Sequence, residues 1–77
     1  MSVVKLCELR PGQRGAVHAM NLTGGMRRRL RDIGLIEGTA VECLGVSPGG
    51  DPRAFLIRGT AIALRAADSA GIEVSVL

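Results

Sequence analysis

The stretch that decides the fold is Met-Arg-Arg-Arg-Leu-Arg-Asp-Ile-Gly-Leu-Ile-Glu-Gly, residues 26–38. Its apolar residues Met26, Leu30 and Ile33 fall at positions i, i+4 and i+7, which share one face of an α-helix. Gly34 then supplies the left-handed residue that ends a helix, and in a Schellman motif Leu35 folds back onto Leu30. The stretch predicts one short helix, with Leu30 and Ile33 in the core, followed directly by a turn.

Short segments separated by glycine and proline surround this helix. Thr23 is the predicted N-cap, because its hydroxyl can accept a hydrogen bond from an unpaired amide of the first turn. In the strand that precedes it, Val17 should face inward, while Ala16, His18 and Met20 should face the other way. Five strands are predicted in all, over residues 13–20, 39–46, 53–57, 60–64 and 72–76. A helical turn is predicted over residues 66–70, before the last strand. This order predicts a mainly β fold, a small closed barrel with the helix inserted after the first strand.

The size and composition of the chain predict one small domain, spanning residues 1–77. Hydrophobic residues make up 47% of the sequence, which is too apolar for a disordered chain, yet Phe55 is its only aromatic residue. No stretch approaches the roughly 20 apolar residues that span a bilayer. The first residues also lack the features of a signal peptide, so we expect a cytoplasmic protein with reduced cysteines and no membrane insertion.

Positive charge gathers in the first half of the chain. The net charge is +3, and half of the ten basic residues are the arginines Arg14, Arg27, Arg28, Arg29 and Arg31. Such a surface favours an acidic partner, which could be a protein, an anionic lipid or a nucleic acid. Barrels that bind nucleic acid usually stack bases on aromatic side chains, so a single Phe argues against a nucleic-acid partner. A solvated helix surface with no partner is the simpler interpretation.

Few residues offer chemistry for a metal site or for catalysis. His18 is the only histidine, and with Cys7 it could ligate Fe(II) or Zn(II), most readily in a site shared between two copies of the chain. The simpler interpretation of His18 is a solvated side chain, and that of Cys43 is a small buried hydrophobe. Asp51 is expected to bond backbone amides near its own loop. Nothing resembles a catalytic set, so we predict that the protein is not an enzyme and requires no cofactor.

The apolar residues beside the arginines have two interpretations. Leu22, Met26 and Leu35 border the predicted helix, and a domain this small cannot cover every apolar side chain. An exposed apolar strip next to a basic helix would form a surface for docking another protein. Alternatively, all three residues belong to the core.

Several motifs together resemble the FeoA family of bacterial ferrous iron transport proteins. They are Arg-Arg-Leu-Arg-Asp-Ile-Gly-Leu-Ile-Glu-Gly-Thr, Ser-Pro-Gly-Gly-Asp-Pro, Arg-Gly-Thr-Ala-Ile-Ala-Leu-Arg and Ala-Gly-Ile-Glu-Val, and the similarity covers residues 9–76. The resemblance implies an SH3-like barrel in the cytosol. It also implies a partner, the cytoplasmic GTP-binding domain of FeoB, the permease for iron(II), with this chain as an accessory or regulator of uptake.

The resemblance further implies where the partner binds. In the family the helix and its flanking loops are the suspected docking surface, which corresponds here to Leu22, Met26, Arg27, Arg28, Arg31 and Leu35. The rival hypothesis is a metal-responsive or metal-bridged homodimer that binds weakly to Fe(II) or Zn(II) through His18 and Cys7.

Overall fold

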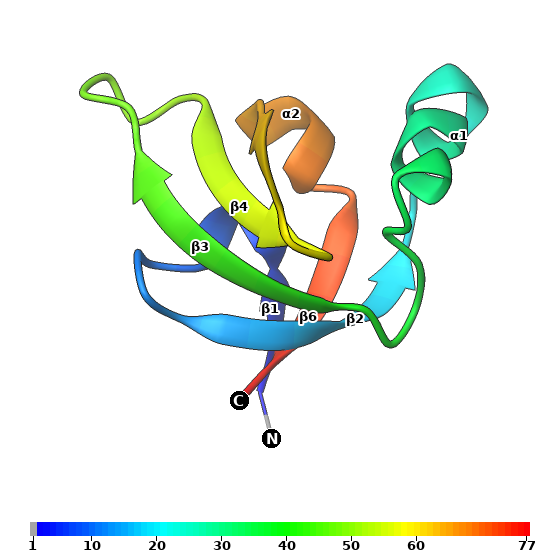
Figure 1. The fold of residues 1–77 in the computed structure, drawn as a ribbon, viewed down its shortest axis with the longest axis horizontal. Helices are drawn as coiled ribbons and strands as arrows, with labels where there is room; N and C mark the ends of the chain where they lie inside the picture. The colour runs from blue at the N-terminus through cyan, green and yellow to red at the C-terminus, as the bar shows by residue number, and fades with distance from the viewer. Residues whose placement is uncertain (1) are drawn as a thin grey trace.

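The structure, a computed structural model, describes residues 2–77 and shows six strands, two short α-helices and one 3₁₀ turn. In chain order these are β1 (Val3–Lys5), η1 (Leu6–Glu8), β2 (Arg14–Met20), α1 (Gly24–Asp32), β3 (Ala40–Val46), β4 (Arg53–Ile57), β5 (Thr60–Leu64), α2 (Ala66–Ser69) and β6 (Ile72–Val76). The strands curl into a small barrel, and α1 stands to one side of it (Figure 1). Within residues 2–77, no helix has the length and apolar character needed to cross a bilayer.

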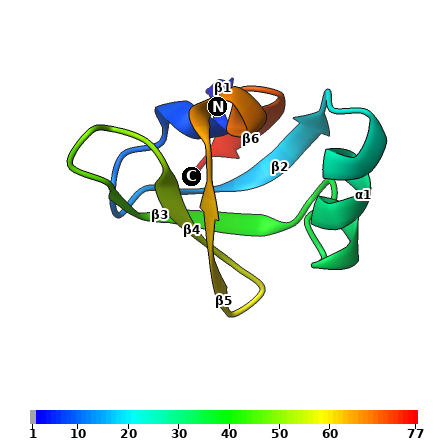
Figure 2. The ribbon, with the colours of Figure 1, turned by 90° about the horizontal axis from the view of Figure 1, so that it is seen from above.

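All strand pairs are antiparallel, in the order β1-β6-β2-β3-β4-β5. The mainly β class is confirmed, but the predicted strand count was one too low. The sequence interpretation missed β1 because only three residues form it, and they are recognisable only through their pairing with β6. Strand pairing also leaves β1 and β5 as the two edges of the sheet. Near these edges η1 packs against α2, so helical turns complete the barrel (Figure 2).

The core follows from the alternation of apolar residues along the strands. Phe55 and Ile57 of β4 and Ile72 and Val74 of β6 have no exposed surface. The remaining buried apolar residues lie on β2, β3, β5, η1, α1 and two loops: Leu6, Leu9, Val17, Leu30, Leu35, Val41, Cys43 and Leu64. The inward orientation of Val17 and the burial of Cys43 are therefore confirmed.

A bulge in β2 overturns one predicted orientation. The register between β2 and β6 shifts between Val17 and Ala19, so His18 is the extra residue. Beyond it Met20 pairs with the buried Ile72 and packs against the core, instead of facing away from it. His18 itself remains exposed.

Two turns connect β3, β4 and β5. Arg58 and Gly59 connect β4 to β5, both with positive φ (49° and 81°), as a tight hairpin with a right-handed twist requires. The loop 47–52 holds Asp51, whose Oδ1 accepts a hydrogen bond from the Ala66 amide at 2.8 Å. Asp51 thus anchors the first turn of α2, bonding a backbone amide distant in sequence rather than one in its own loop.

Candidate functional site

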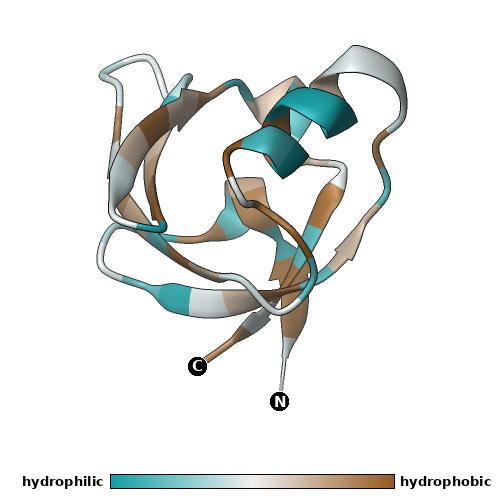
Figure 3. Cartoon of the chain, turned by 45° about the vertical axis from the view of Figure 1, so that its right-hand side comes forward, coloured by the Kyte–Doolittle hydropathy of each residue, from teal (hydrophilic) through white to brown (hydrophobic). Residues whose placement is uncertain are grey.

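Helix α1 is attached to the barrel by few residues and leaves most of its surface in solvent. Leu30 is its buried residue, and Met26 is half-buried against the core. The four arginines Arg27, Arg28, Arg29 and Arg31 are all exposed. Figure 3 shows the outer side of α1 as a hydrophilic band, followed directly by the apolar chain segment that leads to β3. The helix therefore presents a basic outer surface beside an apolar one.

Both ends of α1 were located correctly, although the N-terminal capping bond is missing. Thr23 has the extended backbone of an N-cap residue, but its side chain makes no capping hydrogen bond. At the other end the Leu35 amide donates to the Leu30 carbonyl at 2.9 Å, and the Gly34 amide donates to the Arg31 carbonyl at 2.9 Å. With φ of 93° at Gly34, these two bonds form the predicted Schellman motif.

This helix ending corrects two of the predicted positions. Leu35 is 0% exposed, so it belongs to the core and cannot itself contact a partner in this structure. Ile33 is 41% exposed, although its spacing from Met26 and Leu30 predicted a core residue. The physical reason is that Ile33 is the C-cap of α1, where the chain leaves the helix and the helical face no longer points at the barrel.

The turn after α1 is fixed by Thr39. Its hydroxyl donates to the Gly34 carbonyl at 3.0 Å and accepts from the Ile36 amide at 3.1 Å. Thr39 also joins the turn to β2, because its carbonyl accepts from the Val17 amide at 2.9 Å. Since Thr39 is 8% exposed, water has little access to these groups. The turn therefore keeps a defined shape next to α1.

Replacing Thr39 with valine should loosen this turn. Valine keeps the shape of the side chain but leaves the Ile36 amide and the Gly34 carbonyl without the hydroxyl, at a cost of about 1–3 kcal/mol. Thr39→Ser keeps the hydroxyl and is the matched control. Urea denaturation of both variants checks this prediction, and equal midpoints for valine and serine would show that the two hydrogen bonds do not stabilise the fold.

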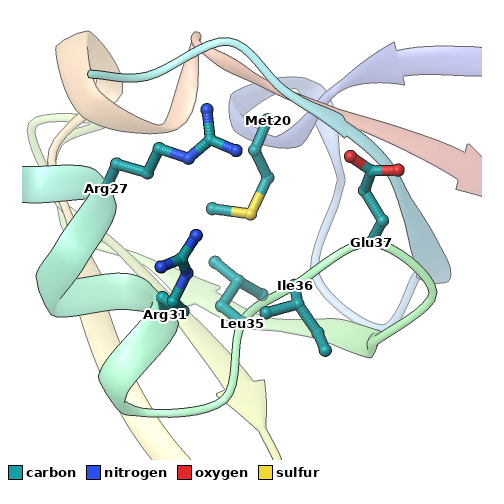
Figure 4. Close-up of a pocket in the computed structure, with 6 residues that line it drawn as sticks. All are labelled: Met20, Arg27, Arg31, Leu35, Ile36 and Glu37. Carbon is teal, nitrogen blue, oxygen red and sulfur yellow. The ribbon is translucent and has the colours of Figure 1, made fainter.

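A pocket of about 250 Å³ lies between α1, the end of β2 and this turn, and we call it the α1 pocket. Its lining consists of Met20, Arg27, Arg31, Leu35, Ile36 and Glu37. Figure 4 shows Arg27 and Arg31 reaching from α1 toward Met20, with Glu37 on the opposite side. The pocket has a cationic wall, an apolar floor and one carboxylate facing the cationic wall.

A second depression, about 280 Å³, runs along the other side of α1 toward β5. Met26, Leu30, Ile33 and Ile62 supply much of its apolar lining. Arg29, Arg65 and Asp68 also border it. Helix α1 thus separates two depressions, and Arg28 lines neither of them.

The other residues predicted for a docking surface flank the helix. Leu22 is half-buried and packs against the core and close to Gly71, so it is only partly available to a partner. Its carbonyl oxygen accepts a hydrogen bond from Nη1 of Arg27 at 3.5 Å. Met26 is half-buried as well, whereas Arg27, Arg28 and Arg31 are exposed. The structure therefore places five of the six predicted residues at the surface and the sixth, Leu35, beneath it.

Three residues of the α1 pocket were missed by the sequence analysis. Met20 was assigned to the wrong face of its strand because the bulge at His18 leaves no mark in the sequence. Glu37 was interpreted only as part of a turn, and Ile36 was given no role. Ile36 is 50% exposed, and an apolar residue at an exposed turn was the signal that could have pointed to a binding surface.

Within residues 2–77, the predicted metal ligands His18 and Cys7 belong to no group of three or more potential ligands. His18 is exposed on β2, Cys7 is half-buried in η1, and Cys43 is buried. In the part of the chain that the structure describes, residues 2–77, no three His, Cys, Asp or Glu side chains come together in a group that could hold a metal ion. The residues present therefore do not fit an intramolecular site of three or more protein ligands.

Comparisons with known proteins agree with the fold and the motifs. The family profile of the FeoA domain matches residues 4–76. The solution structure of FeoA from Chlorobium tepidum is 35% identical, with a TM-score of 0.90, and the match covers 96% of this chain and 70% of that one. A crystal structure of an iron uptake regulatory protein (FeoA) is 27% identical over the whole of both chains, with a TM-score of 0.86.

A third structure adds the fold description and a metal. Stenotrophomonas maltophilia FeoA, a procaryotic SH3 domain protein crystallised with zinc, is 28% identical, with a TM-score of 0.82, over 94% of this chain and 89% of that one. A search among curated proteins found no significant match. The family match covers nearly the whole chain and includes α1, the turn after it and the barrel. This protein therefore belongs to the FeoA family, whose members are small accessory domains associated with ferrous iron transport.

Proposed function

We propose that this protein is a cytosolic accessory or regulatory protein of ferrous iron uptake, and that it docks on the cytoplasmic GTP-binding domain of a FeoB-type permease. Family membership supports the role in iron uptake. The proposed mechanism is binding without catalysis: contact with the permease's soluble domain biases its nucleotide cycle or its gating.

The observation that carries the docking proposal is the surface of α1. Four exposed arginines lie within five consecutive positions, from Arg27 to Arg31, on a helix at one side of the barrel. Half-buried Met26 and exposed Ile33 and Ile36 lie beside them. A basic rim around apolar side chains suits an acidic protein surface, because the charges orient the encounter and the apolar contacts add affinity.

The double variant Met26→Asp plus Arg28→Glu should abolish binding to the purified GTP-binding domain. The carboxylate of the aspartate would have to be desolvated at the interface, and the glutamate repels an acidic partner. Isothermal titration calorimetry with the wild-type chain and with the variant measures the loss, which we expect to exceed about a hundredfold.

Two controls accompany this experiment. Val3→Asp plus Arg10→Glu changes the charge equally at exposed positions away from α1 and should bind like the wild type. Because Met26 packs partly against the core, Arg28→Glu plus Arg31→Glu tests the surface without touching an apolar residue. A wild-type chain that does not bind the GTP-binding domain, or a folded Arg28/Arg31 variant with unchanged affinity, would refute the docking proposal.

A second candidate function is a metal-bridged dimer. It is favoured by the zinc in the Stenotrophomonas maltophilia relative and by the exposed His18. A second copy would have to supply the missing ligands. Anaerobic titration with Zn(II) or Fe(II), followed by molecular mass and by the His18 imidazole resonances, tests this candidate. A mass that stays monomeric, with unchanged His18 resonances, would eliminate it.

A further inference from the structure

Building on the proposed docking function, we propose that the α1 pocket is the specificity site of the surface and receives an acidic side chain of the partner that is flanked by an apolar residue. The carboxylate would lie between Arg27 and Arg31, and the apolar neighbour would cover Met20 and Ile36. The inference thus names the chemistry of the segment that α1 recognises.

The cationic wall of the pocket comes from the spacing of two residues. Arg27 and Arg31 are four positions apart, so their side chains leave the same face of α1, and both reach over the pocket (Figure 4). Nη1 of Arg27 bonds the Leu22 carbonyl at the margin of the bonding range, 3.5 Å, and each guanidinium carries five N–H donors. Two guanidinium groups side by side therefore offer several donors to one anion.

The floor of the pocket favours an apolar group next to the anion. Met20 and Ile36 provide apolar surface beside the guanidinium groups, and the buried Leu35 lies beneath them. A volume of about 250 Å³ is smaller than a typical site for a drug-sized ligand and suits one or two side chains. A carboxylate carried on methylene groups, next to an aliphatic residue, matches both the wall and the floor.

Glu37 makes the charge of the pocket asymmetric, which orients a bound acidic side chain. Its carboxylate lies on the side away from Arg27 and Arg31, so an acidic side chain is attracted to α1 and repelled from the turn. Inorganic phosphate would use the arginines alone and would gain nothing from the apolar floor. Planar carboxylates also accept paired hydrogen bonds from guanidinium groups.

The test uses the full chain and a short peptide probe. The probe is acetyl-Ala-Leu-Glu-Ala-amide, and its matched partner has Gln in place of Glu. Methyl NMR of Met20 and Ile36 follows binding, with peptide added up to about 10 mM because a single anchor binds weakly. The Glu peptide should shift both methyl groups in a saturable way, and the Gln peptide should bind about tenfold more weakly, because it lacks a charge-assisted bond.

Variants of this chain locate the site. Arg27→Gln plus Arg31→Gln should weaken binding of the Glu peptide by about tenfold. Arg28→Gln plus Arg29→Gln removes the same charge from the same helix and should change the affinity by less than about twofold. Glu37→Gln should strengthen binding, because it removes the only carboxylate among the lining residues.

Several outcomes would overturn the pocket assignment. One is an equal loss of Glu-peptide affinity in the Arg27/Arg31 and the Arg28/Arg29 variants. Equal affinities for the Glu and Gln peptides, or for phosphate and the Glu peptide, would also overturn it. So would unchanged Met20 and Ile36 methyl resonances at the highest peptide concentration. The docking function is tested separately with the GTP-binding domain. If the chain binds the peptide but not the GTP-binding domain, the docking function alone is refuted. If the Arg27/Arg31 variant binds the GTP-binding domain as tightly as the wild type does, the pocket assignment alone is refuted.

Discussion

Replacing Phe55 with alanine is expected to unfold most of the protein at 37 °C. Phe55 is the only aromatic residue and is completely buried in β4. Removing a buried Phe side chain costs about 3–5 kcal/mol through lost burial and the cavity it leaves. A single core in a domain of this length supplies about the same amount, 3–5 kcal/mol. The substitution therefore removes nearly all of the net stability.

Thermal unfolding followed by circular dichroism measures this effect. The matched control is Leu56→Ala, one position further along the same strand, where the side chain faces outward and is 36% exposed. That change should cost less than about 1 kcal/mol. A Phe55→Ala variant that melts within a few degrees of the Leu56→Ala variant would mean that this core does not depend on its aromatic residue.

The parts of the fold that the sequence predicts are those decided by neighbouring residues. The stop at Gly34 needs only a left-handed residue followed by Leu35, and the hairpin at Arg58 and Gly59 needs only two positions that accept positive φ. Strands β4 and β5 follow from the alternation on either side of that hairpin, and their predicted bounds are those of the structure. In each case the residues adjacent in sequence were enough to predict the local structure.

The parts that the sequence does not predict depend on distant partners. Strand β1 is held by β6, some 70 positions away in the chain, and its three residues carry too little pattern of their own. The bulge at His18 is defined only by the shift in pairing between β2 and β6. The exposure of Ile33 depends on where the helix leaves the barrel, which helical spacing does not encode.

In the candidate site, too, some residues could be predicted from local sequence and others could not. The arginines of α1 could be assigned to a surface because charge and helical spacing are local. The α1 pocket could not be predicted, because it joins Arg27 and Arg31 to Met20 and to the turn at Ile36 and Glu37. Met20 contributes to the floor of this pocket because the bulge at His18 turns its side chain toward the core.

Replacing Gly15 with alanine is expected to separate β2 from β6. A Cβ at Gly15 would lie 2.5 Å from the Ser75 carbonyl oxygen and 2.5 Å from Cγ1 of Val74. The carbonyl belongs to the backbone of β6, which the pairing of Ala16 with Ser75 holds in place, so the strands must move apart. Such overpacking costs about 1–3 kcal/mol and occasionally more, which is a large fraction of the stability of this domain.

Gly45→Ala in β3 is the matched control, because a Cβ there would meet nothing within 4 Å. Reducing the freedom of the unfolded chain should make that variant more stable by about 0.4–1 kcal/mol, so the two alanines are expected to act with opposite signs. Urea denaturation measures the change in unfolding free energy of both variants and hence its sign. Since β2 also carries Met20 to the floor of the α1 pocket, the Gly15 variant should shift the Met20 methyl resonance while Gly45→Ala leaves it in place. Equal stability of the two variants would show that β2 and β6 do not need a glycine to approach this closely.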